Sequence, residues 1–142
     1  MNKKVHKLTL QENEDFYLIG ISSHENDYRL SWAINNLFGF KFIRTENLRN
    51  LNEKLSIEQE FSVYSYFNAD EPVRYYLTSN RCDNGFLLSN YKNIDFLLVI
   101  IGEYNLEQIN ELISVLKKEP IITAAFLISD LSQKQKKKFS FS

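Results

Sequence analysis

Two stretches in the middle of the chain alternate between more apolar and more polar residues at every second position. Residues 61–67 and residues 73–79 both follow this pattern. A period of two is typical of a strand that turns one face to a core. The pair Asn84-Gly85 then marks a tight turn, and a further short strand is predicted at 86–89. Together these segments predict an antiparallel meander.

Other strands are predicted from short apolar runs. Residues 94–101 are apolar at almost every position, which is typical of a central strand buried on both faces. Residues 16–22 have a similar character, and Gly20 within them predicts a bulge or a close approach of another segment. The remaining predicted strands are 5–10, 40–44 and 121–128.

One long stretch near the N-terminus repeats apolar residues at the spacing of a helix. The predicted helix covers residues 24–38, with Ser23 as its candidate N-cap. Gly39 supplies the left-handed stop that commonly follows a helix. The apolar stripe consists of Leu30, Ile34, Leu37 and Phe38.

A second amphipathic helix is predicted near the C-terminus. Asn105 and Gln108 resemble a capping box at its start, and Pro120 ends it. Its stripe consists of Leu106, Ile109, Leu112, Ile113 and Leu116. A further short helix is predicted after Thr45, from Leu48, Leu51 and Leu55.

This order of elements predicts an α+β two-layer sandwich, with some likeness to the ferredoxin-like arrangement. We expect a mainly antiparallel sheet of about six strands, two main helices on one face, and a C-terminal β-α-β unit. Residues 1–130 form the single expected domain, and residues 131–142 an expected flexible, basic tail. Since two helices cover one face of a sheet, the other face is expected to be open.

The balance of charge differs along the chain. The 142 residues include 17 lysines and arginines and 18 acidic residues. Lys134, Lys136, Lys137 and Lys138 lie after the last acidic residue, Asp130, so the rest of the chain is acidic. An acidic body argues against a large nucleic-acid surface. The four lysines predict a contact with phosphates or an acidic partner, or simply a solvated terminus, which is the simpler interpretation.

The counts of cysteine and histidine exclude several classes of protein. Cys82 is the single cysteine, so an internal disulfide is excluded, and His6 and His24 leave little material for a zinc site. No segment reaches the roughly 18 apolar residues of a membrane span, and no signal peptide is recognised. We therefore expect a cytoplasmic protein with no metal, no cofactor and no membrane contact.

The start of the first helix combines charged and aromatic residues. Asp27, Tyr28, Arg29 and Trp32 lie there, and Asp95 precedes the predicted central strand. These five residues are a candidate polar cluster, in which a buried Arg29–Asp95 pair would be strongly coupled. Such pairs usually fix geometry, so a structural role is the simpler interpretation.

A second candidate site lies on the meander. If the two long strands pair as drawn, Tyr64, Tyr66, Arg74 and Tyr76 project to the same, open side. Tyrosine and arginine are enriched at the centres of interfaces, and tyrosines on a sheet can stack on bases. The simpler interpretation is a half-exposed sheet, because tyrosine also favours strands.

No recognised catalytic motif is present, and we assign no catalytic, cofactor-binding or metal-binding residue. An enzyme of unknown reaction is still one hypothesis, with a site formed by His24, Asp27, Arg29 and Cys82. A His–Asp pair can transfer protons, and a neighbouring cation can activate a thiol. Unreactive structural roles are the simpler interpretation for each of these residues.

The segment LIGISSHENDYRLSWAIN, residues 18–35, carries a longer pattern that begins at Phe16. The pattern F-x-L-I-G-I-S-S followed by D-Y-R-L-x-W-x-I-N resembles the IPExxxVDY family of small bacterial proteins. The motif that names this family falls on residues 88–96, where LSN replaces IPE at 88–90 and IDF is a conservative form of VDY at 94–96. The resemblance implies a bacterial protein, and it implies no activity, cofactor or catalytic residue.

Three functional hypotheses follow. The first is a non-enzymatic cytoplasmic module that binds another protein or a second copy of itself through the open sheet face. The second is an RNA-associated accessory protein that uses the basic tail and the sheet aromatics. The third is the enzyme described above.

Overall fold

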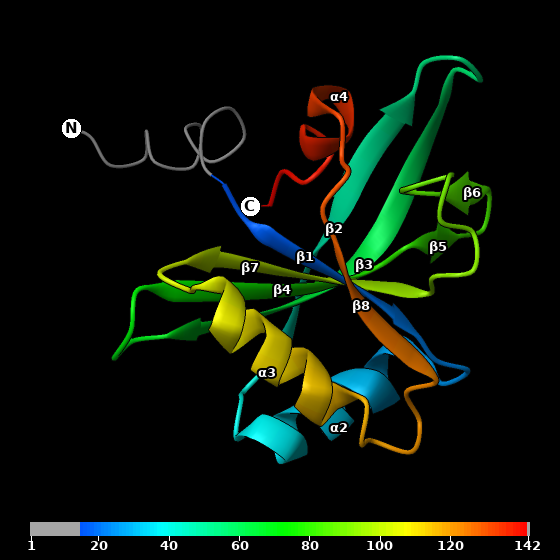
Figure 1. The fold of residues 1–142 in the computed structure, drawn as a ribbon. Helices are drawn as coiled ribbons and strands as arrows, with labels where there is room; N and C mark the ends of the chain where they lie inside the picture. The colour runs from blue at the N-terminus through cyan, green and yellow to red at the C-terminus, as the bar shows by residue number, and fades with distance from the viewer. Residues whose placement is uncertain (1–14, 142) are drawn as a thin grey trace.

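A computed structural model describes residues 15–141 (Figure 1). The strand predicted at 5–10 lies outside the described residues. Along the described chain the elements are β1 (Tyr17–Ser22), α2 (Asp27–Phe38), β2 (Ile43–Asn52), β3 (Ile57–Asn68), β4 (Val73–Ser79), β5 (Arg81–Cys82), β6 (Gly85–Phe86), β7 (Phe96–Gly102), α3 (Leu106–Leu116), β8 (Ala124–Ile128) and α4 (Gln133–Lys136).

Six of the strands form one sheet in the order β2-β3-β4-β7-β1-β8, and every neighbouring pair is antiparallel. Both β7 and β8 run antiparallel to β1, which lies between them, so these two strands are parallel to each other. The helix α3 connects them, which makes a split β-α-β unit. The predicted α+β sandwich with a C-terminal β-α-β is therefore confirmed.

Capping residues fix where the two main helices begin and where α2 ends. Asn26 caps α2 by accepting a hydrogen bond from the Arg29 N–H, so the helix begins later than predicted. Gly39 ends it in the left-handed conformation, with φ 73°. The predicted capping box of Asn105 and Gln108 is present at α3. No helix of the described chain is long and apolar enough to cross a membrane.

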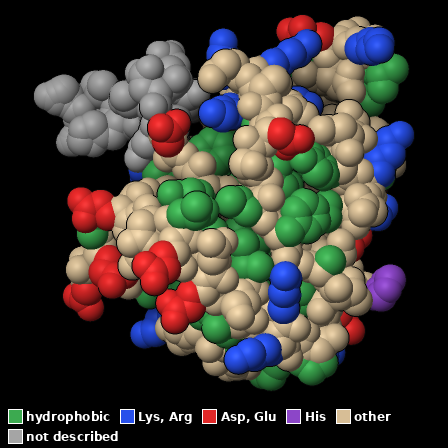
Figure 2. Space-filling model, viewed as in Figure 1, with side chains coloured by type: hydrophobic (Ala, Val, Ile, Leu, Met, Phe, Trp, Pro, Cys, Tyr) green, Lys and Arg blue, Asp and Glu red, His purple; other side chains and the backbone are tan. Residues whose placement is uncertain are grey.

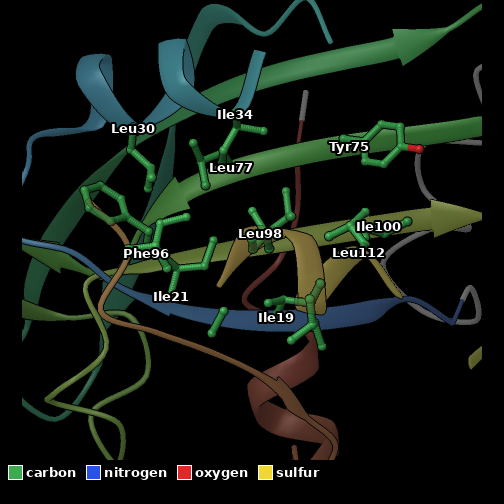
Figure 3. Packing of buried hydrophobic residues seen from close by; sticks show 14 of the residues in the cluster. Ile19, Ile21, Leu30, Ile34, Tyr75, Leu77, Phe96, Leu98, Ile100 and Leu112 are labelled. Atoms are coloured by element: carbon green, nitrogen blue, oxygen red, sulfur yellow. The ribbon is translucent and has the colours of Figure 1, made fainter. Parts of the chain in front are cut away.

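Both main helices pack on the same face of the sheet. Leu30 and Ile34 of α2 and Leu112 of α3 point toward alternate residues of the central strands (Figure 3). We call this layer the helix-side core. Its sheet residues include Ile19, Ile21, Tyr75, Leu77, Phe96, Leu98 and Ile100.

The opposite face of the sheet is also buried, which overturns the expectation of an open face. Leu97, Val99 and Ile101 of β7 point to this side and are at most 1% exposed. We call this layer the second core. It is covered by segment 80–95 and by the C-terminal segment 131–141, through Leu87, Leu88, Ile94, Phe139 and Phe141.

Segment 80–95 has little regular secondary structure, and Asn80 at its start holds it on the sheet. The Asn80 side chain is fully buried; its amide donates to the carbonyl oxygens of Tyr91 at 3.0 Å and Ile94 at 2.9 Å. Its carbonyl oxygen accepts from the Leu88 N–H at 2.8 Å. One side chain therefore satisfies three backbone groups that no strand or helix pairs. The strand predicted at 86–89 is consequently absent beyond Phe86.

The C-terminal segment, predicted to be a flexible tail, packs against the sheet in the described residues. After α4, Phe139 is 2% exposed and its ring lies 5.6 Å from the ring of Phe16. Phe141 is 7% exposed and stacks on Tyr76 with ring centroids 4.1 Å apart. The two phenylalanines that follow the lysines therefore complete the second core.

The short helix predicted after Thr45 is also wrong. Residues there form β2, which pairs with β3 along most of its length, with a shift in register between Thr45 and Leu48. The spacing of Leu48, Leu51 and Leu55 suits a helix, yet pairing with the long strand β3 satisfies the backbone and buries Leu48. Tertiary pairing thus overrides the local pattern.

We expect Phe139→Ala to lower the free energy of unfolding by about 3 kcal/mol, because it leaves a cavity in the second core. Urea unfolding measures the change. Ser140→Ala is the matched control at the exposed neighbouring position and should change stability by less than about 0.5 kcal/mol. Equal stability of the two variants would contradict the packing of the C-terminal segment.

Candidate functional site

The four residues predicted as one interface do not share a face of the sheet. In the pairing of β3 with β4, Tyr66 lies opposite Tyr75, and Ser65 lies opposite Tyr76. Tyr64 and Tyr66 therefore face the helix-side core, whereas Arg74 and Tyr76 face the second core. Alternation along each strand was correctly recognised, but the offset between the strands was not, and a shift of one residue reverses the side.

The three tyrosines of this predicted interface are also packed within the molecule. Tyr66 stacks between Phe40, at 4.9 Å, and Tyr75, at 5.5 Å. Tyr64 is 8% exposed, and its pKa is raised, mainly by burial and then by the nearby Asp27 carboxylate. Since Tyr76 is stacked on the C-terminal aromatic ring, these rings do not present the open docking face that we expected.

Among the tyrosines of this stack, Tyr75 has the pKa that is shifted furthest from its ordinary value. Its ring is 2% exposed, and its hydroxyl lies 3.0 Å from that of Tyr104. Burial, followed by the hydrogen bond to Tyr104, raises the Tyr75 pKa far above its ordinary value. Both causes favour the neutral phenol, so this group stabilises the core and is not poised to lose a proton at neutral pH.

The predicted Arg29–Asp95 pair is not formed. Asp95 accepts from the Arg81 Nε at 2.8 Å through Oδ1 and from the Ser23 backbone N–H at 2.8 Å through Oδ2. Arg81 also donates to the Lys92 carbonyl oxygen at 3.0 Å. Asp95 therefore joins the end of β1, the start of segment 80–95 and β7, which is a structural role.

The other members of the candidate polar cluster lie on α2. Tyr28 and Trp32 are 64% and 57% exposed on the outer side of the helix. Asp27 lies in its first turn, where an acid favours the helix dipole. No hydrogen bond or ion pair between described residues joins Asp95 to Asp27, Tyr28, Arg29 or Trp32, so the cluster is not assembled as one site.

The residues of the enzyme hypothesis are likewise separate. The Cys82 thiol donates to the Asn84 side-chain oxygen at 3.0 Å within the β5–β6 hairpin and packs at the margin of the second core. His24 is exposed in the loop before α2. Within residues 15–141, no hydrogen bond or ion pair joins His24 to Asp27, Arg29 or Cys82. No group of three or more His, Cys, Asp or Glu there is suited to hold a metal ion.

A different feature, the outer edge of β8, is the strongest candidate for binding. The strand ends the sheet, and within the described chain it pairs only with β1. In Figure 1 it crosses in front of the other strands. Its five residues, AAFLI, carry no charge. An edge of this kind presents unpaired N–H and C=O groups to a strand from another chain.

The other edge of the sheet is protected. Along β2, Arg44, Glu46 and Arg49 place charges on the strand, and the register shift between Thr45 and Leu48 interrupts it. Charges and bulges both oppose pairing with another strand. Within the described chain the two edges therefore differ: β2 carries charges and a register shift, whereas β8 carries neither.

Partly exposed apolar side chains continue along both sides of β8. Phe126 is 37% exposed, and Figure 2, drawn in the same view as Figure 1, shows hydrophobic side chains gathered across the middle of this face. Beside β8 lies a hollow of about 200 Å³. Its apolar lining residues are Phe16, Tyr17, Leu18, Leu127, Ile128 and Leu131.

Searches of protein-family models, of curated proteins and of solved structures each found no match to this chain. The resemblance to the IPExxxVDY family therefore stays a prediction. The β8 surface was missed in the sequence because which strand lies at an edge depends on the sheet order. One signal of this surface was present in the sequence: residues 120–129, which include β8, carry no charge.

Stability above pH 10 tests the environment of Tyr75. An unfolded chain releases the Tyr75 proton near pKa 10.0, whereas the folded chain keeps it, so the free energy of unfolding falls as pH rises above that value. We expect Tyr75→Phe to make this fall less steep, by up to about 1.4 kcal/mol per pH unit. Urea unfolding across this range measures the slope, and identical slopes would contradict the assignment.

Proposed function

We propose that this protein is a non-enzymatic, self-associating module whose β8 pairs with β8 of a second copy. The observation that supports this proposal is the edge of β8, which is uncharged and has no second partner strand among residues 15–141, in a sheet whose other edge carries charges and a register shift. The partner is a second copy, because an uncharged antiparallel strand is complementary to itself.

Antiparallel pairing about a two-fold axis at the centre of the strand places Phe126 beside Phe126 of the second copy. The two six-stranded sheets then form one continuous sheet, and the free N–H and C=O groups of both edges are satisfied. No like charges meet within the strand, because AAFLI has none. The arrangement closes after two copies and leaves no free β8 edge.

Five paired residues alone make a short contact, so the side chains beside β8 are part of the proposed interface. A stable interface buries about 800 Å² on each partner. Phe126, Leu127 and Leu131 are partly exposed on this side, together with Phe16 and Tyr17 near the start of β1. Their contact across the axis adds apolar burial to the backbone hydrogen bonds.

We place this function in the cytoplasm. Cys82 is the single cysteine and has no partner for an internal disulfide, which is compatible with a reducing compartment. The proposed activity is binding, and it needs no cofactor or metal.

Exchange of Phe126 for charged residues tests the proposed dimer. Phe126→Lys and Phe126→Glu each place like charges opposite one another across the axis, so each should raise the dimer Kd by about tenfold or more. Mixing the two variants should restore the dimer, because opposite charges then face each other. Analytical ultracentrifugation over a concentration series measures all three samples.

Ile43→Lys is the matched control, because Ile43 is an exposed apolar residue on the other edge strand. It should leave the dimer Kd unchanged. A wild-type protein that stays monomeric at every concentration would overturn the proposal, as would equal weakening by Ile43→Lys. Circular dichroism of each variant shows that a loss of association is not a loss of folding.

A further inference from the structure

A basic groove lies where the C-terminal segment meets the β2–β3 hairpin. The β2–β3 hairpin extends beyond the sheet, and α4 lies beside it (Figure 1). Between them is a hollow of about 450 Å³, which we call the lysine groove; it is lined by residues 50–54 of the hairpin, by Ser89, and by Lys134, Lys137 and Lys138. Small-molecule sites commonly have volumes of about 300–1,000 Å³.

The charge of the lysine groove is strongly positive. Lys54 from the hairpin faces the three lysines of the C-terminal segment across it, and Glu53 is the one acid of its lining. No ion pair within residues 15–141 involves any of these four lysines. In Figure 2 Lys and Arg side chains gather around α4 and the end of the hairpin, with a few acidic side chains among them, whereas most acidic side chains of this face gather on the other side.

Lys138 shows that these charges are held close together. Its ammonium group is partly buried and donates to the Leu87 carbonyl oxygen at 2.9 Å. Its pKa is lowered, first by burial and then by the charge of Lys134. The packing of Phe139 and Phe141 keeps the backbone of this segment on the sheet, so the lysines stay on one surface and a bound anion would offset their repulsion.

The lining also identifies the class of anion. Lysine ammonium groups bind phosphate oxygens as point charges. The Ser89 hydroxyl and the Asn52 amide group add neutral donors, since neither is used as a donor within the described chain. The lining contains no aromatic ring, so it offers no platform for stacking a base.

We propose that the lysine groove binds an oligophosphate, that is, a chain of two or three linked phosphate groups, either free or carried by a nucleotide. Lys54 holds the chain from the hairpin side, and Lys134 and Lys137 hold it from the side of α4. Lys136 of α4 lines the hollow beside β8, but no residue lines both that hollow and the lysine groove. Binding in the groove therefore does not depend on the dimer proposed above.

Isothermal titration with inorganic tripolyphosphate tests the site on the full chain. Binding should weaken steeply as salt rises. The double variant Lys134→Gln/Lys137→Gln should weaken tripolyphosphate binding by about tenfold or more, equal to about 1.4 kcal/mol. Lys54→Gln removes a charge from the hairpin side of the groove and should also weaken binding. All three lysines are exposed, so these variants leave the cores intact.

Lys117→Gln/Lys118→Gln is the matched control, because it removes the same charge from two exposed positions after α3. It should change the tripolyphosphate Kd by less than about twofold. No binding of tripolyphosphate, or equal weakening by the control, would overturn the proposal. So would binding of single-stranded RNA that tripolyphosphate does not displace, since RNA would then be the ligand.

Titration with ATP distinguishes the two sources of the phosphate chain. Affinity equal to that of tripolyphosphate supports a site for the phosphates alone. Tighter binding of ATP supports a nucleotide as the source. The Phe126→Lys variant, in which the proposed dimer is weakened, should bind tripolyphosphate as the wild type does, so failure of the dimer and failure of this site are separate results.

Discussion

The structure depends on one constraint: the central strands β1 and β7 are apolar on both faces, so both faces of the sheet must be kept from water. In β7 Leu98 and Ile100 face the helices, whereas Leu97 and Val99 face the other way, and all four are at most 1% exposed. Burial of an aliphatic side chain contributes about 1.5–3 kcal/mol. Leaving either side of β7 in water would therefore cost several such contributions.

The chain meets this constraint with two different kinds of cover. Helices with capped ends cover one face, and their own backbones are satisfied internally. The other face is covered by segment 80–95 and the C-terminal segment, whose backbones need partners such as the Asn80 side chain. Because both faces are occupied, the two binding surfaces proposed above lie at the β8 edge and where the hairpin meets α4.

Much of the fold could be predicted from local patterns, because caps and periodicity act over a few residues. The capping box of Asn105 and Gln108, the stop at Gly39 and the two-sided character of β7 are of this kind. The faces of Tyr64 and Tyr76 could not be predicted in the same way, since they depend on register between strands. The role of Phe139 and Phe141 was also missed, because four lysines precede them and a charged terminus suggests solvent.

The candidate sites show the same division. Residue types in the sequence suggested a tyrosine-rich interface and an Arg29–Asp95 pair. In the structure Asp95 pairs instead with Arg81, which the sheet topology brings beside it. Four C-terminal lysines were recognised from the sequence, and three of them line the groove, which forms because the hairpin that carries Lys54 reaches α4. Neither the β8 edge nor the groove is local in the sequence.

The claim that the C-terminal segment closes the second face is tested most directly by NMR of the aromatic rings. Tyr76 and Phe141 stack with centroids 4.1 Å apart and planes 2° from parallel. We expect strong nuclear Overhauser effects between these two rings and upfield shifts of their protons. Phe141 ring protons at random-coil shifts, with no effect to Tyr76, would contradict it.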